Sequence, residues 1–148
     1  MSTGNQIEVL NDLIQINNDR IEGYNKAIKN MEDGTDLRLL FSSMVEQSQH
    51  FAHDLREEVR KLGGEPEKGT TAAGKIYRTW MDVKAQFGGT DRESILNSCE
   101  FGEDAAKNAY KMALENNDLN EAQRDLIHRQ QSEQLSAHNR IKGLRDTN

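Results

Sequence analysis

Carboxylate and imidazole side chains are the residues of this sequence whose types and spacing could do chemistry. Glu103 and His138 lie in two different segments, whereas Glu46, His50 and His53 follow one another at spacings of four and three residues. Carboxylate oxygens and imidazole nitrogens are common ligands of divalent transition metals. Both groups are therefore candidate metal sites, and iron and manganese are the candidate metals.

No motif for covalent or nucleotide chemistry accompanies these residues. The sequence has no Gly-rich phosphate loop and no nucleophile elbow, and we interpret Gly63-Gly64 and Gly88-Gly89 as helix ends. We therefore predict no catalytic residue and no cofactor-binding residue. Whether the chain is an enzyme stays open at this point.

The elements that must position these side chains are helices. Apolar residues recur every three or four positions, the period of one helix face, over about 6–31, 36–62, 90–115 and 118–145, with a shorter run over 71–87. Aromatic residues make up only 5% of the chain, which disfavours a large β-sheet. The chain is 30% charged and 34% hydrophobic, as expected for amphipathic helices with wide solvent-facing sides.

Helix-ending and helix-starting signals set the predicted topology. Gly34 and Gly63-Gly64-Glu65-Pro66 end the first two helices, and the capping boxes Thr90-x-x-Glu93 and Asp118-x-x-Glu121 begin the last two. Short turns make each pair antiparallel, and the connection over about 63–89 crosses the bundle. We expect residues 1–148 to form one domain, an all-α, ferritin-like up-down-down-up four-helix bundle with a short helix in the crossover.

Polar residues occupy the middle of the predicted bundle. On a helical wheel, the inner faces carry four neutral polar residues near the helix midpoints: Asn17, Ser48, Gln130 and Gln134. Glu103 and His138 lie on the flanks of their apolar stripes. This layer has two interpretations. It is either a hydrated polar layer that fixes helix register, or a degenerate metal site that uses Glu103 and His138.

A di-metal carboxylate centre in such a bundle needs a different residue set. It takes a Glu from each of two helices and a Glu-x-x-His motif from each of the other two. No Glu-x-x-His occurs in this sequence. The layer therefore offers too few carboxylates for two metal ions.

The histidines of the second helix face outward in this scheme. Glu46, His50, His53 and Glu57 share the face opposite the apolar stripe, so they form either a solvated surface or a metal site between subunits. The pair Asp125-x-x-His128 also projects outward.

Four further residues are assigned to the interior or to packing. Tyr24 and Tyr110 point inward, so their hydroxyls need partners that the polar layer can supply. Cys99 is predicted to be a buried core residue. Trp80 is the predicted apolar anchor of the short crossover helix.

The overall charge limits the partners. Nineteen basic and 25 acidic residues give a net charge of −6, with no basic cluster for nucleic acid. No segment has the 18 or so apolar residues of a membrane span. One cysteine, no signal-peptide pattern and no membrane span make a cytoplasmic protein the expectation.

Several short motifs carry a resemblance to a known family. They are Gly63-Gly64-Glu65-Pro66, Arg78-x-Trp80 and Gly102-Glu103-Asp104, followed by Tyr110, His138 and Leu144-Arg145. Their order resembles a bacterial family of ferritin-like four-helix bundles catalogued as a domain of unknown function. The resemblance implies a ferritin-like fold and a bacterial source, and it implies no established activity.

The sequence departs from bacterioferritin-type helices at the metal ligands. Asn17 stands seven residues before Tyr24, where those proteins have Glu, and Ser48-x-x-Phe51 and Leu135-x-x-His138 replace their Glu-x-x-His motifs. Only His138 remains as a ligand, so iron oxidation by that set is not expected.

Three functional hypotheses follow. The first is a non-catalytic protein that acts through assembly or binding, with a role in stress by analogy of fold. The second is a metal-binding oxidoreductase or iron-handling protein with a degenerate di-metal site. The third, a DNA-protecting Dps-like cage, is disfavoured by the acidic charge. A homo-oligomer is expected, with a dimer favoured.

Overall fold

The structure is a computed structural model that describes residues 3–31, 35–67 and 92–146. These residues form four helices and no strand, so the all-α prediction is confirmed for the described part of the chain. The helices are α1 (Thr3–Asn30), α2 (Thr35–Lys61), α4 (Arg92–Leu114) and α5 (Glu121–Asp146). The predicted helix over 71–87 with Trp80, the predicted cap at Thr90 and the predicted turn at Gly34 lie outside the described residues.

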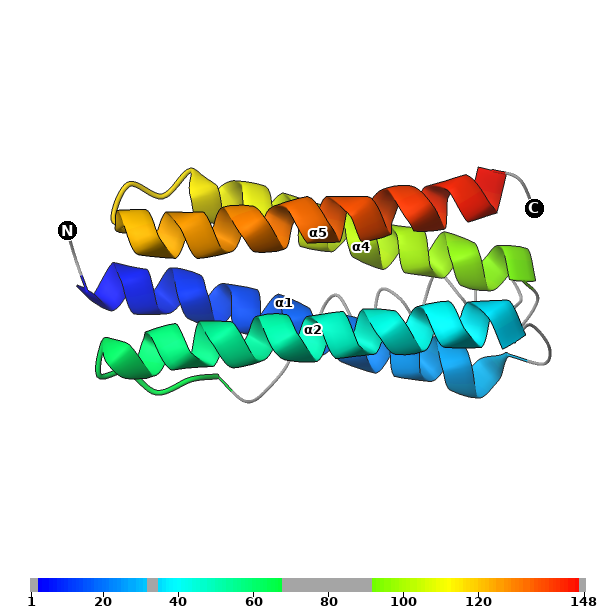
Figure 1. Ribbon diagram of the computed structural model, residues 1–148, viewed down its shortest axis with the longest axis horizontal. Coiled ribbons are helices and arrows are strands. Elements are labelled where there is room, and N and C mark those ends of the chain that lie inside the picture. Colours follow the sequence, from blue (N-terminus) through cyan, green and yellow to red (C-terminus); the bar gives the residue numbers. More distant parts are fainter. Residues whose placement is uncertain (1–2, 32–34, 68–91, 147–148) are drawn as a thin grey trace.

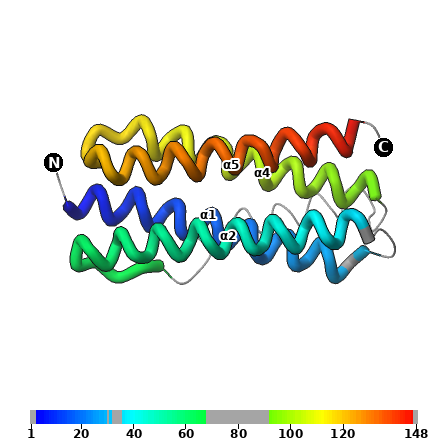
Figure 2. The backbone as a smooth tube through the Cα atoms, viewed as in Figure 1, coloured from blue at the N-terminus to red at the C-terminus, as the bar shows by residue number. Residues whose placement is uncertain are grey.

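The four helices form an elongated bundle of two antiparallel pairs. α1 lies along α2 and α4 lies along α5, while α1 also packs against α4 (Figure 1). α1 ends and α2 begins at one end of the bundle, whereas α4 ends and α5 begins at the opposite end (Figure 2). The directions are therefore up, down, down and up, as predicted.

The end of α2 follows from its two glycines. Gly63 has a φ of 80°, in the left-handed region that glycine enters without strain. The Gly64 amide donates to the Val59 carbonyl and the Gly63 amide to the Arg60 carbonyl, each at 3.0 Å, which is the Schellman pattern. A Cβ at Gly64 would lie 2.8 Å from Ile7 Cδ1, so glycine also allows the chain to approach α1 closely.

The start of α5 differs from the sequence prediction. The Asn120 amide donates to Gln123 Oε1 at 2.9 Å, and the Gln123 amide donates to Asn120 Oδ1 at 2.8 Å. These reciprocal bonds are a capping box. The predicted box Asp118-x-x-Glu121 is wrong, because the helix begins at Glu121 and Asp118 instead accepts a hydrogen bond from Asn5.

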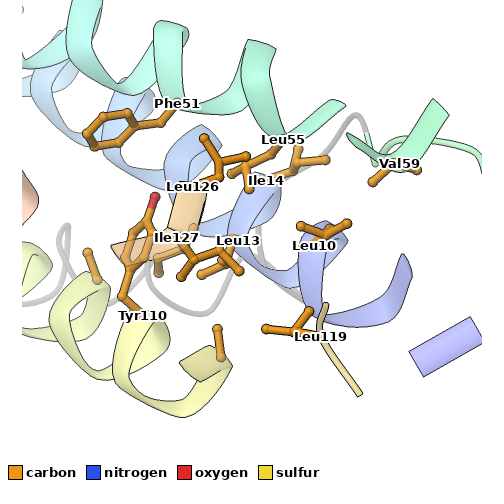
Figure 3. Packing of buried hydrophobic residues seen from close by; sticks show 13 residues of the cluster. Leu10, Leu13, Ile14, Phe51, Leu55, Val59, Tyr110, Leu119, Leu126 and Ile127 are labelled. Carbon is orange, nitrogen blue, oxygen red and sulfur yellow. The ribbon is translucent and has the colours of Figure 1, made fainter. Parts of the chain in front are cut away.

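The apolar core consists of two clusters. The first lies where α4 ends and α5 begins, and it includes Leu13, Leu55 and Ile127. Phe51 and Tyr110 lie at one end of this cluster (Figure 3), and their ring centroids are 6.4 Å apart. The second cluster fills the other half of the bundle. It includes Phe41, Leu96, Cys99 and Ile141, and the predicted burial of Cys99 is confirmed.

None of α1, α2, α4 and α5 combines the length and the apolar character that a bilayer-spanning helix needs.

Candidate functional site

A layer of buried polar side chains lies at mid-bundle, between the two apolar clusters. The four residues predicted for this layer, Asn17, Ser48, Gln130 and Gln134, are all buried. The layer also contains Arg20 and Glu103, and both are essentially inaccessible to solvent. The interior therefore holds charged groups in addition to the amides, and Asp19 of α1, next to Arg20, is also buried.

Arg20 of α1 and Glu103 of α4 form a two-point ion pair. Arg20 Nε donates to Glu103 Oε1 at 2.9 Å, and an Arg20 Nη2 hydrogen donates to Glu103 Oε2 at 3.0 Å. The two side chains are only 1% and 0% exposed. Arg20 Nη2 also donates to Gln47 Oε1 at 2.9 Å. The planar guanidinium suits this two-point binding of a carboxylate.

Further donors surround the Glu103 carboxylate. The Tyr24 hydroxyl donates to Oε2 at 2.5 Å, and Gln134 Nε2 contacts Oε1 at 3.3 Å and the Glu103 carbonyl at 2.9 Å. Both carboxylate oxygens are thus occupied by hydrogen bonds from α1 and α5. Arg20 balances the charge of this buried carboxylate, and the hydrogen bonds fix its orientation.

The electrostatics of the pair shift its neighbours. Burial is the largest single effect and lowers the pKa of Arg20, but Glu103, Tyr24 and Tyr110 together outweigh it, so the net pKa is raised. Arg20 therefore stays protonated. Burial, and next the negative charge of Glu103, raise the pKa of Tyr24 well above its usual value. The Tyr24 hydroxyl thus remains a donor.

A second chain of hydrogen bonds completes the layer. Asn17 Nδ2 donates to the Tyr110 hydroxyl at 2.9 Å, and that hydroxyl donates to Gln130 Oε1 at 2.7 Å. Gln130 Nε2 then donates to the Phe51 carbonyl at 3.2 Å. The prediction that Tyr24 and Tyr110 would find partners in the polar layer is confirmed.

These residues do not fit a di-metal carboxylate centre. Among the hydrogen bonds described above, the carboxylate that is held is that of Glu103, and its charge is already balanced by Arg20. The other oxygens in these hydrogen bonds belong to side-chain amides, hydroxyls and backbone carbonyls, which do not neutralise two divalent cations. Arg20 Nη1 is buried with no hydrogen-bond partner among the described residues, and a donor of this kind repels a cation.

The two predicted interior ligands, Glu103 and His138, have different partners. His138 Nε2 lies 2.5 Å from Asp104 Oδ1, and Asp104 is the residue that follows Glu103 on α4. Ligand atoms of Glu100, Asp104 and His138 all lie within 4.8 Å of one another. In the part of the chain that the structure describes, this is the one group of three such side chains that is close enough to share an ion.

The predicted surface candidates lie on the outer side of the bundle, as the helical wheel indicated. Glu46, His50 and His53 are on the outer face of α2, and Glu57 follows them on the same helix. The first three line a shallow depression on one helix, together with Gln49. The pair Asp125 and His128 lies on α5.

Sequence reasoning missed Arg20, Glu100 and Asp104. Arg20 lies three residues after Asn17 and four before Tyr24, so its position on the inner face was readable from the spacing. Arginine is rarely buried unless it is paired, and the residue that pairs with Arg20 lies on another helix. Glu100 and Asp104 are four residues apart on one helix face, and only the packing of α5 shows that His138 faces them.

The fold defines the class of protein. It is a ferritin-like four-helix bundle, as three solved structures show. One is a mutant of Dps1 from Mycobacterium smegmatis, with a TM-score of 0.83 and 18% identity over 98% of this chain and 99% of that one.

The second is a dodecameric thioferritin, the bacterioferritin-related protein from Bacteroides fragilis, with a TM-score of 0.76 and 16% identity, covering 97% of this chain and 85% of that one. The third comes from Bacillus anthracis and is described among ferritin-like, diiron-carboxylate proteins. Its TM-score is 0.72 and its identity 20%, over 98% and 99% of the two chains.

The family follows from the sequence. Residues 5–116 match the family described as Domain of unknown function (DUF2383), so the chain belongs to that family. No protein with curated function matches it. The resemblance inferred from the sequence motifs is thereby confirmed.

Proposed function

We propose that this protein is a ferritin-like bundle in which the Arg20–Glu103 ion pair replaces a di-metal centre. It acts through assembly or binding and does not oxidise iron at mid-bundle. The observation that carries this proposal is the buried two-point pair, with distances of 2.9 and 3.0 Å.

The charge of Arg20 gives the physical reason. At an effective dielectric constant of 20, two unit charges about 4 Å apart interact by roughly 4 kcal/mol, so a divalent ion at that distance would be repelled by roughly 8 kcal/mol. Arginine does not lose its proton to relieve this repulsion. Iron would therefore have to displace Arg20, and the displaced guanidinium would then lack its carboxylate partner.

Assembly from several copies of the chain is the second part of the proposal. One structural neighbour is described as dodecameric, which supports oligomerisation of this fold. Three large apolar side chains, Leu39, Phe101 and Met112, are exposed on the helices and are available for contacts between copies. Of the possible assemblies we favour a dimer. The net charge of −6 speaks against nucleic acid as a partner, and a cytoplasmic location remains our prediction.

An iron-oxidation assay tests the proposal. Untagged protein is mixed with Fe(II) in air, and formation of Fe(III) is followed by absorbance. We expect the wild type and Glu103→Gln to form Fe(III) at the same rate, because Glu103 holds no iron. Oxidation of two iron ions per chain that is lost in Glu103→Gln would refute the proposal. Light scattering of the same sample measures the number of chains per particle.

Metal binding outside the polar layer is the second candidate function. It is favoured by Glu100, Asp104 and His138, whose ligand atoms lie close together on α4 and α5. The ferritin-like, diiron-carboxylate description of one neighbour makes iron a reasonable ion to test.

A further inference from the structure

Three metal-ligating side chains meet on the boundary between α4 and α5. Glu100 and Asp104 are four residues apart on α4 and therefore lie on one face of that helix. His138 approaches them from α5, and its Nε2 lies 2.5 Å from Asp104 Oδ1. One ligand atom from each residue lies within 4.8 Å of the other two.

We propose that Glu100, Asp104 and His138 bind one divalent first-row transition-metal ion between α4 and α5. Ligand-to-metal distances of about 2.0–2.2 Å place neighbouring ligands about 3–4 Å apart, which small side-chain movements reach from the present separations. The imidazole suits zinc or iron better than magnesium or calcium, and the two carboxylates also suit manganese. Two carboxylates balance the charge of one divalent ion, and water completes its coordination.

The burial of the three side chains suits a bound ion. The side chains of His138 and Glu100 are 8% and 12% exposed, whereas that of Asp104 is 54% exposed. Two ligands are thus held in place by packing, and the third opens the site to solvent. This gives the ion a route in and leaves room for water ligands.

The other ring nitrogen of His138 also has a partner. His138 Nδ1 lies 3.4 Å from Asn139 Oδ1, an acceptor for an Nδ1–H proton. In the metal-free chain a proton on Nε2 bridges the contact to Asp104, and a bound ion would take the place of that proton. Metal-binding histidines are commonly oriented by a hydrogen bond at the nitrogen that does not bind the metal.

Arg145 competes with the ion in this arrangement. Its guanidinium forms an ion pair with Glu100 and another with Asp146, the latter at 2.8 Å. Binding of a cation would release Glu100 from Arg145, which keeps Asp146 as its partner. Arg145 therefore weakens metal binding, and its removal should strengthen it.

Calorimetric titration of the untagged protein with Zn²⁺ tests the site, and Co²⁺ absorption spectra report the ligand set. We expect one ion per chain. Asp104→Asn and His138→Gln should each weaken binding by about tenfold or more, whereas Arg145→Gln should tighten it. The matched control is Asp125→Asn combined with His128→Gln, because it removes a carboxylate and an imidazole from another part of α5.

Unchanged zinc affinity in both Asp104→Asn and His138→Gln would overturn the proposal, and so would loss of binding in the Asp125/His128 control. If Arg145→Gln bound zinc no more tightly than the wild type, the claim that Arg145 competes with the ion would be wrong. Circular dichroism of each variant checks folding. Because Asp104 is an exposed residue, Asp104→Asn still tests the site if His138→Gln unfolds. The result is independent of iron oxidation at mid-bundle, because none of these variants alters Arg20 or Glu103.

Discussion

Arg20 and Glu103 join α1 to α4 through two parallel hydrogen bonds of 2.9 and 3.0 Å in the interior of the bundle. The pair separates two apolar clusters and is held by Tyr24, Gln47 and Gln134. The Arg20 side chain thus places a positive charge in the interior of the bundle. Similar folds with different residues at mid-bundle can therefore differ in chemistry.

Removal of one member of the pair should destabilise the protein strongly. Arg20→Met or Glu103→Leu leaves a buried charge without its partner, and each should lower the free energy of unfolding by about 3–5 kcal/mol. The double variant removes both charges and should recover most of that loss. Urea unfolding of the four proteins measures the coupling, and a double variant with the summed loss would contradict the pairing.

Tyr24→Phe tests the hydrogen bond to the Glu103 carboxylate. The Tyr24 hydroxyl donates to a charged acceptor at 2.5 Å, so its loss should cost about 1.5–3 kcal/mol of the free energy of unfolding. In the Arg20→Met/Glu103→Leu background the acceptor is absent, and the same change should cost much less. Equal losses of the free energy of unfolding in the two backgrounds would show that the Tyr24 hydroxyl does not stabilise the protein through the Glu103 carboxylate.

Stability should fall at alkaline pH. Burial, followed by Glu103, raises the pKa of Cys99 and of Tyr24 well above their usual values, and burial is also the largest cause of the raised pKa of Tyr110. In the unfolded chain these groups lose their protons near pH 8.5 for cysteine and about 10 for tyrosine. Above those values the unfolded state binds fewer protons than the folded state, so the free energy of unfolding decreases as pH rises.

Urea unfolding between about pH 7 and 11 measures this dependence. Each group contributes a slope of up to about 1.4 kcal/mol per pH unit between its unfolded and folded pKa values. Cys99→Ala should remove the part of the decrease that begins near pH 8.5. A free energy of unfolding that stays constant to pH 11 would be inconsistent with the raised pKa values.

The corrected start of α5 gives a direct comparison of two candidate caps. Asn120→Ala breaks one of two reciprocal hydrogen bonds and should cost about 1 kcal/mol. Asp118→Ala removes an exposed hydrogen bond with Asn5 but leaves both bonds of the Asn120–Gln123 cap in place, so it should cost less. Thermal unfolding of both variants ranks them, and a larger loss for Asp118→Ala would favour the box predicted from the sequence.

The helices and most of the polar layer could be predicted because helical spacing is strongly periodic. Asn17 and Gln134 interrupt apolar stripes, so the wheel placed them inside. The cap of α5 was ambiguous, because Asp118-x-x-Glu121 and Asn120-x-x-Gln123 overlap and carry equivalent residue types. Sequence spacing alone does not decide which of two overlapping boxes forms.

The charged members of the site could not be predicted from one helix at a time. Arg20 is tolerated inside only because Glu103 arrives from another helix, 83 positions along the chain. His138 faces Asp104 for a similar reason, since the two helices must pack before their side chains meet. Contacts between helices depend on packing angle and rotation, which the apolar period of each helix does not fix.

Anomalous diffraction from crystals soaked in Mn²⁺ tests the central claim most directly, because it locates every bound ion. The Arg20–Glu103 pair predicts no manganese peak bound to Glu103, with the guanidinium still seated on the carboxylate. Two manganese ions coordinated by Glu103 at mid-bundle, with Arg20 displaced, would contradict it.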